Sequence, residues 1–136
     1  MKYIKIYEYY NSEYDFNLLK LDIEGIFVEV KDFGYKIFIF PCIDKNYENF
    51  LIQINAPVGI DITSRDRVLV RECIKMCIDY LKYKCVDIII RYKYYTRNSD
   101  GSYAGAINAR TLLLDDKYSS RINNPVYKIE VIVKIK

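Results

Sequence analysis

Residues 64–97, SRDRVLVRECIKMCIDYLKYKCVDIIIRYKYYTR, join a helix pattern directly to a strand pattern. In the first half, apolar side chains recur at the spacing of three and four that lines one side of a helix. They are Val70, Cys73, Ile74, Cys77, Ile78 and Leu81. Thr63 or Ser64 can cap this helix, because Thr63 and Asp66 have capping-box spacing. The pattern predicts a helix over about 64–83 that packs on a sheet through its apolar stripe.

A long strand is predicted after the helix, because side chains of alternating character follow one another over residues 86–97. One face would carry Ile88, Ile90, Tyr92 and Tyr94, and the other Ile89, Arg91, Lys93, Tyr95 and Arg97. Residues 98–101, Asn-Ser-Asp-Gly, are a strong turn signal. The return arm runs from Tyr103 to Leu114, and its small residues permit close packing or a bulge.

The last predicted strand covers residues 126–135, after Pro125. Apolar and aromatic side chains alternate there with charged ones, which is typical of a half-buried strand. Tyr127, Ile129, Val131, Val133 and Ile135 share one side, opposite Lys128, Glu130 and Lys134. The pattern therefore groups Tyr127 with the apolar side of the strand.

The first 59 residues contain several shorter patterns. In residues 2–9, Ile4 and Ile6 alternate with Lys5 and Tyr7, which predicts a first strand. Residues 11–24 have a mixed, polar composition and are interpreted as a loop or irregular turn. Residues 50–54 form a strand that ends at the break over residues 55–59.

A hairpin is predicted between residues 25–31 and 35–40, because both segments are rich in β-branched and aromatic residues. Gly34 lies in the short connector, where a tight hairpin needs a positive φ. Pro41 is expected to end the second strand, because proline cannot donate to a ladder.

The predicted element order is β-ββ-β-α-β-β-β over one domain, residues 1–136, a usual size for a single core. No βαβαβ alternation is present, which argues against a doubly wound parallel sheet. We therefore expect an α+β fold, with one mainly antiparallel twisted sheet and a single long helix packed on one face.

The chain has no histidine, which removes the commonest general base and the commonest metal ligand. Catalysis by Ser-His-Asp or Cys-His is thereby excluded. No glycine-rich phosphate loop is present, because Gly101 and Gly105 lack the following Lys-Ser/Thr. We expect no catalytic residues, no cofactor and no enzymatic activity.

Cysteine usage indicates reduced thiols. The four cysteines are Cys42, Cys73, Cys77 and Cys85, and they lack the closely spaced pairs of structural zinc sites. The N-terminus lacks the apolar run of a signal peptide, and no stretch is long enough to span a membrane. We therefore expect a cytoplasmic protein without metal and without membrane contact.

One weak catalytic pattern remains. Glu29-Val30-Lys31 matches the E-x-K half of the restriction-type nuclease motif, and the predicted hairpin would place it on a strand. A Mg²⁺ site would need a second acid, for which Asp22 or the acid-rich loop 115–117 is available. The alternative is an exposed hairpin face with cross-strand charge pairs, which we favour because such triplets arise often in a lysine-rich chain.

The strand 86–97 carries a basic and aromatic face. Arg91, Lys93 and Arg97, with Arg110 or Arg121 nearby, can track phosphates while tyrosine stacks on bases. An ordinary solvated sheet face has the same composition, and we favour that interpretation. The net charge of +3 and the pI of about 8.5 permit nucleic-acid binding without implying it.

Our leading hypothesis is a non-catalytic binding protein that acts through a protein–protein interface. The chain has fifteen tyrosines, and tyrosine is a favoured contact residue, although AT-rich codons also explain such a bias. The turn 98–103 is rich in Asn, Ser, Gly and Tyr, which fits a contact loop and a plain turn equally. Candidate binding residues are Arg91, Lys93, Tyr95, Arg97, Tyr103 and Arg110.

In profile, though not in motif, the chain is similar to small phage-encoded inhibitors of host defence and to toxin-neutralising immunity proteins. The alternatives are a nucleic-acid or nucleotide binder that uses the basic and aromatic face, and a Mg²⁺-dependent nuclease that uses Glu29 and Lys31. We also expect that a sheet edge left without a partner permits a homodimer.

Overall fold

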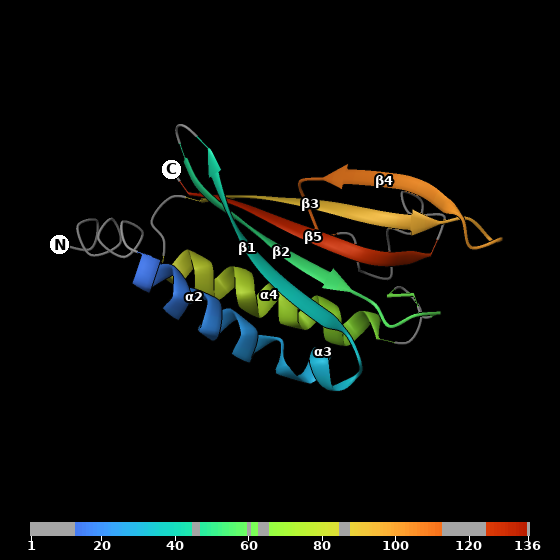
Figure 1. Ribbon diagram of the computed structural model, residues 1–136, viewed down its shortest axis with the longest axis horizontal. Coiled ribbons are helices and arrows are strands. Elements are labelled where there is room, and N and C mark those ends of the chain that lie inside the picture. Colours follow the sequence, from blue (N-terminus) through green and yellow to red (C-terminus); the bar gives the residue numbers. More distant parts are fainter. Residues whose placement is uncertain are drawn as a thin grey trace.

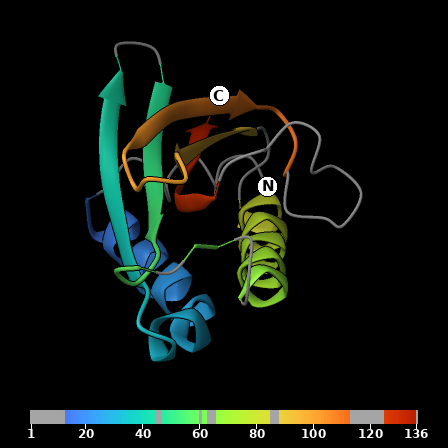
Figure 2. The same ribbon diagram turned by 90° about the vertical axis from the view of Figure 1, so that its right-hand side faces the viewer.

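The computed structural model describes residues 13–44, 47–59, 61–62, 66–84, 88–112 and 125–135. In chain order the elements are α2 (Glu13–Ile26), α3 (Val28–Asp32), β1 (Lys36–Asp44), β2 (Tyr47–Asn55), α4 (Arg67–Lys84), β3 (Ile88–Arg97), β4 (Tyr103–Ala109) and β5 (Val126–Ile135). The strands form one antiparallel sheet in the order β1-β2-β5-β3-β4. Figures 1 and 2 show these helices on one side of the twisted sheet. The predicted α+β fold is confirmed.

The long helix is confirmed as α4, and all six residues of the predicted stripe are buried. It packs against the helix-facing side chains of the sheet, among them Ile52, Ile54 and Val131. Burial raises the pKa of the Cys77 thiol to about 12, and burial together with the carboxylates of Glu29 and Glu72 raises that of Cys73. Both thiols therefore act as small apolar core groups. The predicted caps, Thr63 and Ser64, lie outside the described residues.

The predicted hairpin over 25–31 and 35–40 is wrong, because its first arm is helical. Residues 13–26 and 28–32 form α2 and α3, so the segment interpreted as a loop or irregular turn is also helical from Glu13 onward. Leu19, Ile23, Phe27 and Val30 are all fully buried at intervals of four, four and three residues. Burial at that spacing is a helical face, and contact with the core overrides the strand propensity of the local sequence.

The real N-terminal hairpin joins β1 to β2. Pro41 does not end β1, which continues to Asp44 in unbroken register with β2. The strand tolerates this proline because β1 is an edge strand: among the described residues, no strand lies on its other side to accept a hydrogen bond. The predicted strand 2–9 lies outside the described residues.

The predicted strands 86–97 and 126–135 are confirmed as β3 and β5, and the return arm as β4. The strand predicted over 50–54 is β2, which is longer at both ends. Within the described ranges, no helix has the length and apolar character needed to cross a membrane.

Candidate binding surface on the outer face of the sheet

We call the side of the sheet away from these helices the outer face. On β3, Tyr92 and Tyr94 are buried toward the helices, while Lys93, Tyr95 and Arg97 are partly exposed on the outer face. The predicted alternation of this strand is therefore correct. Arg91 lies on the outer face too, opposite Ile132 of β5.

A β-bulge adds one residue to the outer face that the alternation pattern places elsewhere. Tyr95 pairs with Lys128 and Thr96 pairs with Val126, so Tyr127 is an extra residue in β5. Val126 and Ile129 are buried, whereas Tyr127 and Lys128 between them are both partly exposed. The one sequence signal for the bulge is the succession of two apolar residues, Val126 and Tyr127, after Pro125.

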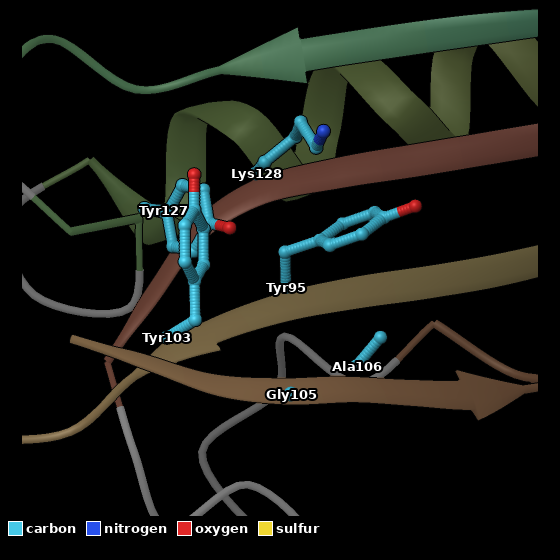
Figure 3. A pocket seen from close by; sticks show the side chains of 6 residues that line it. All are labelled: Tyr95, Tyr103, Gly105, Ala106, Tyr127 and Lys128. Atoms are coloured by element: carbon cyan, nitrogen blue, oxygen red, sulfur yellow. The ribbon is translucent and has the colours of Figure 1, made fainter.

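The bulge completes a group of aromatic rings that we call the tyrosine cluster: Tyr95, Tyr103 and Tyr127. The ring centroids of Tyr103 and Tyr127 are 5.5 Å apart, and those of Tyr95 and Tyr127 are 6.4 Å apart. Together with Lys128, Gly105 and Ala106, the cluster lines a shallow hollow of about 360 Å³ (Figure 3). Gly105 and Ala106 of β4 present no large side chain there, so a ligand group can approach the rings.

Three cations lie against these rings. The Lys128 Nζ is 4.1 Å from the centroid of Tyr95, and the Lys93 Nζ is 5.2 Å from the same centroid. The Arg97 Cζ is 4.5 Å from the centroid of Tyr127. These distances are within the range of cation–π attraction, which holds the long side chains over the rings. Three positive charges therefore lie beside the tyrosine cluster.

A hydrogen-bonded chain fixes the Tyr95 ring. Its hydroxyl donates to Glu130 Oε1 at 2.5 Å, and the Gln53 Nε2 donates to Glu130 Oε2 at 3.1 Å. The Asn55 Nδ2 in turn donates to the Gln53 Oε1 at 3.1 Å. Both oxygens of Glu130 thus have protein donors, so this carboxylate acts as a support for the cluster.

The pKa values of Tyr95 and Tyr127 are both raised, which suits hydrogen bonding to a ligand better than proton transfer. Partial burial, the hydrogen bond to Glu130 and the charge of that carboxylate raise the pKa of Tyr95 to about 12. Partial burial and the neighbouring Tyr103 also raise the pKa of Tyr127. Both phenols therefore remain neutral hydrogen-bonding groups near neutral pH, where a general acid or base would need a pKa close to 7.

Alkaline titration tests this arrangement. The ordinary tyrosine pKa is 10.0, so Tyr95 keeps its proton in the folded protein while the unfolded chain loses it, and its stabilising contribution declines between pH 10 and about 12. We expect the tyrosinate absorbance difference between the protein and Tyr95→Phe to develop near pH 12. In a Glu130→Gln background the same difference should develop at lower pH. An unshifted titration near pH 10 would contradict the hydrogen bond.

The hairpin tip mainly contacts itself. The backbone N–H and the hydroxyl of Ser102 both donate to the Asp100 Oδ1, at 2.9 and 2.6 Å, and these bonds lower the pKa of Asp100. The Asn98 Nδ2 donates to the Ser102 Oγ at 3.0 Å. The tip is therefore an ordered turn, and Tyr103, which is 78% exposed, is its contribution to the tyrosine cluster.

Arg110 does not join the cluster. It follows Ala109, which pairs with Tyr92, so it lies at the end of β4 remote from Tyr103. Arg121 lies outside the described residues.

The E-x-K triplet lacks the context that its nuclease interpretation requires. Glu29 and Lys31 lie on the short helix α3 and not on a strand, which corrects the prediction. The acid-rich loop 115–117 lies outside the described residues, and Asp22 accepts a hydrogen bond from the Tyr80 hydroxyl of α4. Among the described side chains, no group of three potential metal ligands comes together.

An apolar zone adjoins the cluster on the outer face. Phe38 and Phe40 of β1 are 42% and 44% exposed, and their rings are stacked with centroids 6.0 Å apart. Phe40 pairs with Leu51, which in turn pairs with Ile132. The outer face thus has an apolar part that includes Phe38, Phe40 and Leu51, and a cationic, tyrosine-rich part around Tyr95 and Tyr127.

Comparison of the chain with protein families, with curated proteins and with solved structures finds no match.

Proposed function

We propose that this protein is a non-catalytic binding protein that contacts another protein through the outer face of its sheet. The observation that carries the proposal is the tyrosine cluster, whose three rings and three cations lie together on an open face. Tyrosine and arginine are, with tryptophan, enriched at the energetic centres of interfaces. Rings held by cations and by Glu130 lose little conformational freedom on binding, which favours affinity.

The size of the outer face supports a protein as the partner. Five strands about 4.8 Å apart, four of them about 30 Å long and β4 shorter, present roughly 600 Å² before side-chain relief is added. A standard interface buries about 800 Å² on each partner. The apolar zone beside a charged rim is also the usual anatomy of a protein interface.

Binding without chemistry is how an inhibitor or an immunity protein acts, because covering the target's working surface is sufficient. We therefore extend the proposal to an inhibitory role of that kind, in the cytoplasm, where the buried thiols Cys73 and Cys77 remain reduced.

The proposal is tested by affinity capture from a lysate of the source cells, with and without nuclease treatment. We expect one stoichiometric protein that survives nuclease and is lost with the triple variant Tyr95→Ala, Arg97→Ala, Tyr103→Ala. The matched control is Tyr83→Ala with Lys84→Ala on α4, where a lysine Nζ also lies 5.8 Å from a tyrosine centroid. Capture that survives the triple variant in a folded protein would exclude this surface.

A second candidate function is binding of single-stranded nucleic acid. It is favoured by Lys93, Arg97 and Lys128, which lie against tyrosine rings where phosphates can approach while bases stack. It predicts binding to labelled oligonucleotides that weakens steeply as salt is raised. Absence of binding at low salt would remove this candidate.

A further inference from the structure

The edge strand β1 has a sequence that is complementary to itself in antiparallel pairing. Lys36-Ile37-Phe38-Ile39-Phe40 places Lys36, Phe38 and Phe40 on the outer face, and Ile37 and Ile39 toward the core. When two such segments pair with Phe38 opposite Phe38, each Lys36 lies opposite Phe40 of the second copy. Each Ile37 then lies opposite Ile39 of the second copy.

We propose that β1 pairs antiparallel with β1 of a second copy of this chain, with Phe38 on the two-fold axis. This inference does not depend on the tyrosine cluster, although Phe38 and Phe40 also form the apolar zone of the outer face. The register follows from the order of side chains and from isologous symmetry, in which residue i contacts j and j contacts i.

Side-chain chemistry supports this register on both sides of the sheet. On the outer face, the two Phe38 rings meet at the centre, flanked by the two Phe40 rings, and such aromatic pairs stabilise neighbouring strands. Each lysine faces the ring of a phenylalanine, an arrangement that permits cation–π attraction. On the inner face, isoleucine meets isoleucine and extends the core. Part of the apolar area that Phe38 and Phe40 expose is then covered.

The two edge strands of the sheet, β1 and β4, differ in how well they can pair with a strand of a second copy. β1 keeps an unbroken register with β2, and within the described part of the chain no strand pairs with its other side. β4 has a register shift beside Thr96, and its Gly105 adopts a φ of +126°, irregularities that discourage strand addition. Pro41 follows the paired segment directly, so in this register it lies outside the five paired residues and stops the pairing there.

The extent of the interface predicts a weak dimer. Five paired residues form a contact about 17 Å long, which places the area buried at the small end, below roughly 1,200 Å² in total. We expect association in the micromolar range and therefore a concentration-dependent mass. Sedimentation equilibrium should show a change from 16.2 kDa toward twice that mass as the concentration rises.

Charge variants at position 38 test the register. Phe38→Lys alone and Phe38→Glu alone each place like charges opposite one another, and each should weaken dimerisation at least about tenfold. Mixing the two variants in equal amounts places opposite charges there and should restore the dimer, which also proves that both variants fold. The matched controls are Tyr83→Lys and Tyr83→Glu on α4, where Tyr83 is 74% exposed; each should dimerise as the parent does.

Two outcomes would overturn the inference. One is a mass of 16.2 kDa for the unaltered protein at every concentration up to about 1 mM, beyond which association is too weak to be specific. The other is a dimer that Phe38→Lys leaves unchanged, because the contact would then lie elsewhere on the surface. Neither outcome bears on partner capture by the tyrosine cluster.

Discussion

Phe27→Ala is expected to lower the free energy of unfolding by about 3–5 kcal/mol, the usual cost of removing a fully buried aromatic ring. Phe27 is 0% exposed at the junction of α2 and α3, where it packs with Leu19, Ile23 and Val30 in the core. Deleting the ring leaves a cavity between the helices and the sheet that neighbouring side chains fill only in part.

The neighbouring residue supplies the control. Val28 is 51% exposed, so Val28→Ala should change the free energy of unfolding by less than about 1 kcal/mol. Urea denaturation of the two variants, followed by circular dichroism, measures both values. A strand over 25–31 would bury Val28 with Val30 and expose Phe27, so it predicts the opposite order. That reversed order would contradict the helical assignment.

The contrast between α4 and α2 shows what the sequence can predict. In α4, charged residues separate the apolar ones, so the stripe from Val70 to Leu81 has a helical period and only that period. At the end of α2, the run Ile26-Phe27-Val28 is apolar throughout and fits a strand or a helix equally. Tertiary contact with the sheet decides between them, and the local sequence does not contain that contact.

The candidate site also has a part that the sequence predicts and a part that depends on tertiary structure. The positions of Lys93, Tyr95 and Arg97 follow from alternation within one regular strand and were predictable. The pairing of Tyr95 with Lys128 comes from the strand order, which a sequence without an alignment does not reveal. Tyr127 was misplaced because a bulge reverses the side-chain alternation on one side of it, and pattern analysis assumes that the alternation is unbroken.

Tyr127→Ala is expected to weaken binding of the captured protein partner by about thirtyfold or more, which corresponds to at least about 2 kcal/mol. Tyr127 contacts Tyr95, Tyr103 and Arg97, so its removal deprives both other rings of their neighbour and the guanidinium of its support. Since its side chain is only partly buried, the free energy of unfolding should fall by less than about 1 kcal/mol.

Tyr83→Ala is the matched control, because this exposed tyrosine lies on α4, away from the outer face, and should bind the partner as the parent protein does. Calorimetric titration with the captured partner gives the affinities, and urea denaturation gives the stabilities. Together, the two measurements distinguish a β5 with regular side-chain alternation from a β5 with the bulge. With regular alternation Tyr127 would be a core residue, and its loss would cost about 3–5 kcal/mol of stability. With the bulge, the same substitution should lower affinity and leave the fold intact, because the ring is partly exposed on the outer face.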